Sequence, residues 1–289
     1  MQKLKFYYAL LCCVACFIAP ASALASLRLI VLDSTTAEII IALGAQDQII
    51  ATSSSADFLP ELTHSVKLPG FKQGSSETLF ALKPTHIVQT SERLQPQTRA
   101  QLVRLGINII DLNDESTLSG AVKRIHLVGE LLGRTAEATE LAARFSQQMA
   151  ELQQEVQAEP LNVKGVFILA GGGRPTVAGG RDTHAAALLG FAGVENIADA
   201  IQGYKIMSQE ALVAASPDFI LTNQEGLHTD QHGLAAVLKA PGVQHTTAYT
   251  KHALFSLPGR YLQGVGLSTP TGVRLLRTQI KQVLQEHTP

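Results

Sequence analysis

Residues 70–87 read GFKQGSSETLFALKPTHI, and residues 203–220 read GYKIMSQEALVAASPDFI. The two segments share glycine, lysine, serine, glutamate, leucine, alanine, proline and isoleucine at one constant spacing of 133 residues. A segment that returns so far along a single chain indicates two similar lobes. Proteins of this plan usually bind their ligand between the lobes, so we expect the functional site in a cleft there.

The segments around both copies predict the same kind of lobe. In the first half, apolar runs typical of buried strands alternate with helical patterns, and the expected strands are 27–32, 49–52, 86–89 and 107–112. In the second half, the expected strands are 165–169, 219–222 and 253–255, with helices at 183–192, 208–215, 235–239 and 269–286. This alternation predicts an α/β fold in which each lobe is a mainly parallel sheet flanked by helices.

A long helical stretch lies between the two copies. Residues 116–157 keep a helical pattern that Gly133 divides, and the part from 136 onward lacks proline and is rich in strong helix formers. We therefore expect one long, stiff helix to join the lobes and to restrict their closure to small motions. The predicted domains are an N-terminal lobe at 26–133, a linking helix at 134–158 and a C-terminal lobe at 159–289.

The first 25 residues have the composition of a secretory signal. Lys3 and Lys5 precede an apolar run at 6–20, and small residues follow at 21–25, so we expect a cleavable signal peptide over 1–25 and a periplasmic location. An uncleaved anchor and a lipid-bearing cysteine remain alternatives. All three cysteines fall within this segment, which predicts a mature chain without a disulfide or a thiolate metal site.

Charge and motifs argue against several classes of protein. Without Lys3 and Lys5 the chain has 21 basic and 24 acidic residues, and it has no tryptophan, a poor composition for binding nucleic acid. The glycines at 171–173 do not open a phosphate-binding loop or a dinucleotide fingerprint. No Gly-x-Ser-x-Gly motif is present. We therefore expect no enzyme activity and no catalytic cofactor.

Histidines and glutamates supply the remaining candidates for binding. His228 and His232 are four residues apart, but their surroundings favour a polar loop over a metal site. His184 opens a predicted helix after a loop of small residues, where a ligand contact and a local hydrogen bond are equally good interpretations. Glu77 and Glu210 occupy the same place in each copy, either as capping partners or as a pair of charges for a two-fold partner carrying arginines.

Several segments resemble a known family. Residues 36–44 (TAEIIIALG), 81–84 (ALKP) and 211–218 (ALVAASPD) are similar to the helical-backbone class of bacterial periplasmic substrate-binding proteins, which feed ABC importers for haem, cobalamin and siderophores. Residues 171–179, 203–212, 240–243 and 257–266 are most similar to the haem-binding members. The resemblance implies that the lobes clamp haem as the transported ligand, and that Glu77 and Glu210 dock on the dimer of an inner-membrane ABC permease.

The chain departs from these relatives at one position. Haem-binding members place a tyrosine after the glycine of the first copy and bind iron through it, whereas this chain has Phe71. The resemblance then implies His184 or Tyr204 as the axial ligand, with Phe71, Lys72, Arg174 and Arg260 in the haem cleft. The alternatives are cobalamin or a ferric siderophore, a periplasmic enzyme on the same scaffold, and capture of zinc or manganese by histidines such as His64 and His86.

Overall fold

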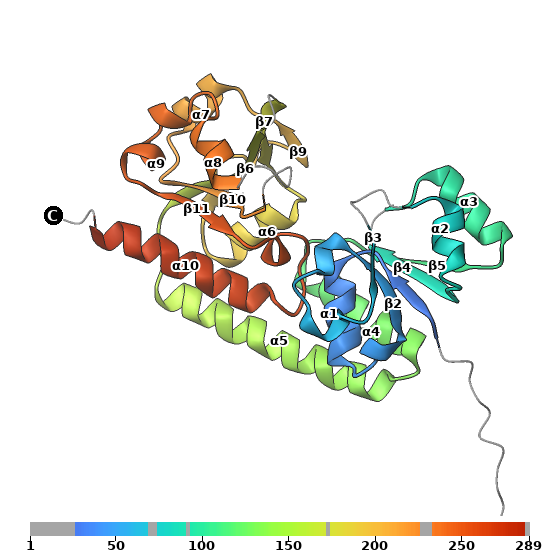
Figure 1. Ribbon diagram of the computed structural model, residues 1–289. Coiled ribbons are helices and arrows are strands. Elements are labelled where there is room, and N and C mark those ends of the chain that lie inside the picture. Colours follow the sequence, from blue (N-terminus) through green and yellow to red (C-terminus); the bar gives the residue numbers. More distant parts are fainter. Residues whose placement is uncertain (1–26, 69–73, 91–92, 172–173, 226–232, 287–289) are drawn as a thin grey trace, which may run out of the picture.

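The structure is a computed structural model that describes residues 27–68, 74–90, 93–171, 174–225 and 233–286 (Figure 1). The predicted signal peptide lies outside these ranges. The first lobe contains β1 (Leu29–Val31), α1 (Ser34–Ala42), β2 (Ile49–Ser53), β3 (Val66–Leu68), α2 (Ser76–Ala81), β4 (His86–Thr90), α3 (Pro96–Arg104), β5 (Asn108–Leu112) and α4 (Leu118–Leu132). Within the described ranges, no helix combines the length and the apolar character needed to cross a bilayer.

The first sheet has the strand order β3-β2-β1-β4-β5, and every neighbouring pair is parallel. The chain leaves β1 toward β2 and later returns to the other side of β1 with β4, so the strand order reverses between these two strands. Buried Asp33 joins their carboxyl ends, because it caps α1 through the Thr36 N–H at 2.8 Å and accepts the Thr90 N–H at 3.0 Å. In open α/β sheets such a reversal is the usual place for a ligand crevice.

The second lobe contains β6 (Lys164–Gly171), β7 (Arg174–Gly179), α6 (His184–Phe191), β8 (Glu195–Asn196), β9 (Tyr204–Ile206), α7 (Gln209–Ala215), β10 (Phe219–Asn223), α8 (Gly233–Leu238), α9 (Thr247–Thr250), β11 (Leu254–Leu257) and α10 (Thr269–Glu286). Its sheet has the order β11-β10-β6-β7-β9, with β8 also paired to β6. β8, β6, β10 and β11 are parallel, whereas β7 pairs antiparallel with both β6 and β9. The prediction of mainly parallel sheets is confirmed, and the antiparallel edge is an addition to it.

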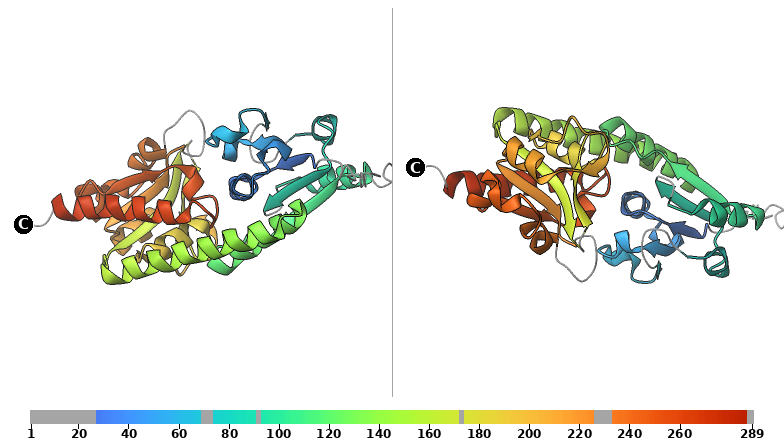
Figure 2. Two further views of the ribbon diagram at one scale, coloured as in Figure 1. Left: turned by 90° about the horizontal axis from the view of Figure 1, so that it is seen from below. Right: turned by 90° about the horizontal axis from the view of Figure 1, so that it is seen from above.

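One long helix joins the two sheets, as expected. Helix α5 (Thr135–Ala158) follows α4 after Gly133, whose φ of +67° is a left-handed conformation that favours glycine. Helix α10 lies beside α5 (Figures 1 and 2). Arg274 of α10 pairs with Glu155 of α5 at 2.8 Å, and Lys281 pairs with Glu159 just beyond the end of α5. The connection is therefore braced by a second helix.

A single hydrophobic cluster runs through both lobes. It includes Leu29 and Val31 of the first sheet, Phe145 of α5, and Phe167 and Leu221 of the second sheet, all at most 3% exposed. Burying one such side chain stabilises a fold by about 1.5–3 kcal/mol. Because these contacts are shared, the lobes are packed on one another and the junction between them is a fixed part of the fold.

Candidate functional site

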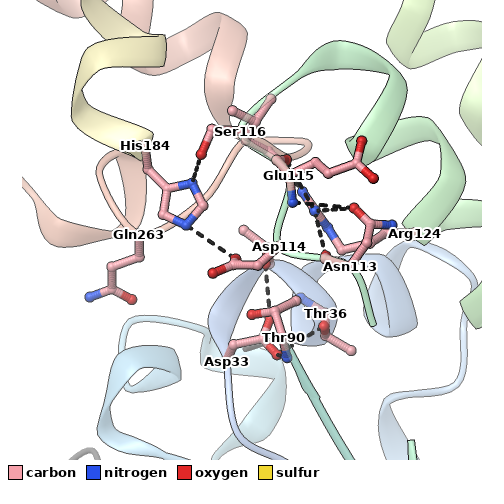
Figure 3. Close-up of polar contacts among 12 residues, drawn as sticks. Asp33, Thr36, Thr90, Asn113, Asp114, Glu115, Ser116, Arg124, His184 and Gln263 are labelled. Carbon is pink, nitrogen blue, oxygen red and sulfur yellow. Dashed lines mark hydrogen bonds and ion pairs between the residues drawn. The ribbon is translucent and has the colours of Figure 1, made fainter. Parts of the chain in front are cut away.

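His184 holds the two lobes together at the start of α6. Its Nδ1 lies 2.8 Å from the Ser116 hydroxyl, and its Nε2 lies 3.2 Å from a carboxylate oxygen of Asp114 (Figure 3). Both partners belong to the loop between β5 and α4 of the first lobe, and the His184 side chain is only 15% exposed. We call these three residues the His184 clasp. Since both ring nitrogens have partners, His184 would have to leave the clasp to bind a metal.

Serine, histidine and aspartate also form the triad of serine hydrolases. In that triad the aspartate holds Nδ1 and the serine faces Nε2. In the clasp the two nitrogens are exchanged, and serine and aspartate are two residues apart on one loop. This geometry fits a contact that grips the ring from both sides.

Buried Arg124 of α4 fixes the loop that carries Asp114 and Ser116. Its Nη1 donates to the Asn113 carbonyl at 2.9 Å and lies 3.4 Å from the Glu115 carbonyl. Its Nη2 donates to the carbonyl of Val265 in the second lobe. Arg124 is 1% exposed, and burial lowers the pKa of its guanidinium while the nearby carboxylates of Asp33, Asp114 and Glu115 oppose that shift. One cation therefore positions the clasp loop and also joins the lobes.

The segment 263–266 of the second lobe packs on the N-terminal end of α1 in the first lobe. The Ser34 hydroxyl donates to the side-chain oxygen of Gln263 at 3.2 Å. A Cβ on Gly264 would lie 2.6 Å from the Thr35 methyl group, so only glycine permits this approach. We call residues 263–266 the plug, because they cover the α1 end beside the strand reversal of the first sheet.

Tyr204 lies on the edge strand β9 and reaches the same end of α6 as His184. Its ring packs edge-on against Phe167, yet Tyr204 and Ile206 remain 44% and 67% exposed. Burial of the hydroxyl raises the pKa of Tyr204, and its hydrogen bonds with the Thr183 side chain and the Ala185 backbone partly oppose that increase. The structure thus brings the two candidate axial ligands together at one helix terminus.

The other predicted cleft residues are placed differently. Arg260 stacks over Phe58 of the first lobe at 5.3 Å and over Tyr261 at 4.8 Å, which makes it a further contact across the junction. Phe71 and Lys72 lie outside the described residues, as do His228 and His232. Arg174 begins β7, but only its backbone is described. Across the described ranges, no three histidine, cysteine, aspartate or glutamate side chains gather as a metal-ion site.

Glu77 and Glu210 have matching positions in the two lobes. Each is the second residue of a short helix, α2 or α7, and each helix is capped by a serine, Ser75 or Ser208, whose hydroxyl accepts a backbone N–H at 3.2 Å. Both glutamates are exposed. Hydrogen bonding lowers both pKa values, mainly by Ser75 at Glu77 and by Gln209 at Glu210. Each lobe thus carries, at a matching position, one exposed carboxylate whose pKa is lowered.

A buried carboxyl group, Glu38 of α1, faces the second lobe near the plug. Burial raises the pKa of Glu38 to about 7, and hydrogen bonds from Ser268 together with the charge of Arg260 limit the increase. Below pH 4.5 the group is neutral in folded and unfolded chains alike. As the pH rises toward 7, the unfolded chain ionises first and the folded chain loses stability.

Glu38→Gln should therefore become more stabilising, relative to the wild type, as the pH rises. At about 1.4 kcal/mol per pKa unit, the gap between 4.5 and about 7 corresponds to about 3 kcal/mol of unfolding free energy between pH 4.5 and pH 8. Urea unfolding across this range measures the difference, with exposed Glu130→Gln as the matched control. A difference between Glu38→Gln and wild type that stays constant with pH would contradict the assignment.

His184 is a candidate from the sequence, but its partners Asp114 and Ser116, and also Arg124 and Glu38, are not. Two signals point to part of this set in retrospect. Asp114 and Ser116 follow an apolar strand, at the sheet edge where ligands and lobe contacts gather. Arg124 stands on the otherwise apolar buried face of α4, where an unpaired cation is costly. Neither signal predicts which residue of the second lobe Asp114, Ser116 or Arg124 contacts.

Two α/β lobes, a long joining helix and a polar junction define the molecule as a two-lobed binding protein. The chain belongs to the periplasmic binding protein family, whose model matches residues 29–261. It is similar in structure to the periplasmic haem-binding protein RhuT from Roseiflexus sp. RS-1 in its apo form. That similarity has a TM-score of 0.82 and 27% identity, and it covers 89% of this chain and 99% of the other.

Two curated relatives are similar in sequence. One is the uncharacterised ABC transporter substrate-binding lipoprotein YvrC of Bacillus subtilis, 25% identical over 80% of this chain and 72% of its own length. The other is a cobalamin-binding protein of Halobacterium salinarum, 24% identical over 77% of this chain and 60% of its own length. The chain is accordingly a substrate-binding protein of the ABC-importer type.

Proposed function

We propose that this protein carries haem through the periplasm to an inner-membrane ABC importer. The observation that carries the proposal is the exposed apolar face of Tyr204 and Ile206 on β9, beside the N-terminal end of α6. Haem needs an apolar surface, an axial donor and cations near its propionates. Tyr204 supplies both ring surface and a phenol oxygen, and exposed Arg181 lies on the loop whose backbone pairs with Gln202 next to β9.

The Tyr204 hydroxyl is the better of the two axial candidates. His184 is held on both ring nitrogens by contacts from the other lobe, whereas the hydroxyl of Tyr204 has hydrogen-bond partners only within its own lobe and the residue as a whole is 44% exposed. Burial raises the pKa of Tyr204, and its hydrogen bonds with the Thr183 side chain and the Ala185 backbone oppose that increase, so coordination to ferric iron would supply the remaining drive toward the phenolate. Tyr204 thus takes the role that the haem-binding relatives give to a tyrosine of the first lobe.

Delivery to the importer is proposed to use Glu77 and Glu210. The repeat places one exposed, ionised carboxylate on each lobe, and α2 and α7 both lie along the upper side of Figure 1. A permease dimer presents each of its surfaces twice, so it could offer one arginine to each lobe. Export through a signal peptide in residues 1–25 is part of the same proposal.

Titration of the purified mature protein with hemin tests the ligand. We expect a saturable change in the Soret band, and we expect Tyr204→Phe to shift the absorption of the bound ferric haem because it removes the oxygen donor. The matched control is Tyr249→Phe, which removes the hydroxyl of a tyrosine on α9 with a similar exposed fraction, 40% against 44%. His184→Ala should leave the ligation spectrum intact and alter the lobe contact only.

Cobalamin is the second candidate, because a relative is named for it. Titration with cyanocobalamin under the same conditions separates the two ligands. Saturable binding of cyanocobalamin without a response to hemin would replace haem by cobalamin. A hemin response that is identical in wild type and Tyr204→Phe would remove Tyr204 as the axial ligand.

A further inference from the structure

An apolar pocket lies beside Glu77 on the first lobe. It has a volume of about 390 Å³ and lies between α2 and α3, where Phe80, Ala81 and Leu105 form its apolar part. Phe80 is 42% exposed and Leu105 is 48% exposed, so both present unusually large apolar surface to solvent. Such surface on a water-soluble lobe commonly marks a contact with a protein partner. We call this feature the α2–α3 pocket.

Charged groups at the rim of the pocket indicate the chemistry of that partner. Glu77 lines it from α2, and Arg104 lines it from the last turn of α3. The Ser76 hydroxyl bonds the Gln101 side chain at 2.5 Å and holds the two helices in this relation. A complementary surface must present a cation toward Glu77, a hydrogen-bond acceptor toward Arg104 and an apolar side chain for the pocket.

The second lobe differs at the corresponding place. The repeat aligns Phe80 with Val213, which is smaller and half-buried. Helix α7 packs against the short helical turn Val243–His245, and a Cβ on Gly242 would lie 2.8 Å from the Cβ of Gln209. The neighbourhood of Glu210 is therefore built differently from the open flank of α2.

We propose that the α2–α3 pocket receives an apolar side chain of the ABC permease, next to the basic residue that pairs with Glu77. This inference rests on the docking role proposed for the two glutamates and adds a contact that distinguishes the lobes. Truncating a central apolar contact commonly weakens an interface by tenfold or more, and here that contact would add to the charge pair that both lobes share. The first lobe then forms the stronger and more specific half of the docking surface.

Photocrosslinking identifies the occupant directly. A benzophenone amino acid in place of Phe80 should crosslink, in intact cells, to a permease peptide that holds a basic and an apolar residue, as mass spectrometry can establish. The same amino acid in place of Val213 is the matched control and should give at most a tenth of that product. Phe80→Ala should bind the permease–ATPase complex in lipid nanodiscs about tenfold more weakly, and Val213→Ala should bind within twofold of wild type.

The outcomes separate this inference from the docking proposal. Binding of Phe80→Ala within twofold of wild type, or crosslinks from Phe80 to a protein other than the permease, overturns the pocket inference. Wild-type binding by the Glu77→Ala, Glu210→Ala double variant overturns the docking role of the glutamates instead. Because Phe80 is partly exposed, thermal unfolding should show Phe80→Ala to be folded at the assay temperature.

Discussion

Cells that depend on this protein for haem should lose at least about nine-tenths of their haem import when Glu77 and Glu210 are both replaced by alanine. Removing one partner of a charge pair that becomes desolvated in an interface costs about 2–5 kcal/mol, and two such losses weaken docking by more than about a hundredfold. Hemin affinity should not change, because neither carboxylate belongs to the lobe junction. Uptake of labelled hemin by cells and hemin titration of the purified variant measure the two quantities separately.

The control for this experiment is a pair of glutamates with similar exposure and no place in the repeat. Glu137→Ala with Glu140→Ala removes the same charge from the outer surface of α5 and should import haem normally. If the double variant at Glu77 and Glu210 imports haem as fast as this control, the two carboxylates do not dock the protein.

Arg124→Met should lower the free energy of unfolding by about 3 kcal/mol or more. Methionine keeps much of the apolar stem but donates no hydrogen bond, so the carbonyls of Asn113 and Val265 lose their donor inside the protein. The substitution also leaves the neighbouring carboxylates of Asp33, Asp114 and Glu115 without a buried counter-charge. Urea unfolding followed by circular dichroism measures the loss.

Arg144→Met is the matched control. Arg144 is an exposed residue of α5 whose ion pair with Glu140 spans 3.7 Å, so its loss should cost less than about 0.5 kcal/mol. A loss below about 1 kcal/mol for Arg124→Met would mean that the junction is held mainly by apolar packing, and that Arg124 is dispensable to it.

Much of the fold follows from the sequence because local patterns determine it. The repeat predicts the equivalent helices α2 and α7, and each has a serine cap and an exposed glutamate at its second position. Gly133 predicts the boundary between α4 and α5. Strands β7 and β9 could not be predicted from the sequence. The segment that forms β7 is rich in glycine and proline and is more typical of a turn, and β9 consists of three exposed residues without an apolar run.

The site is less accessible to sequence reasoning because its contacts join distant residues. His184 is a recognisable candidate, but its partner Ser116 lies 68 positions away on the other lobe. The same holds for Arg124 and Val265, which are 141 positions apart. Helix starts, helix caps and strand ends are determined by neighbouring residues in the sequence. The contacts of a residue across the junction depend instead on how the two folded lobes pack together.

The plug has a consequence for the order in which the molecule matures. Ser34 and Gln263, which join there, are separated by 229 positions along the chain. The N-terminal lobe therefore cannot complete this surface until nearly the whole polypeptide is available, and contacts of such long range are slow to form. If the chain crosses a membrane with its N-terminus first, the N-terminal lobe emerges before residues 263–266 are available to pack on it. The surface of α1 around Ser34 is then covered only when the C-terminal part of the chain has crossed.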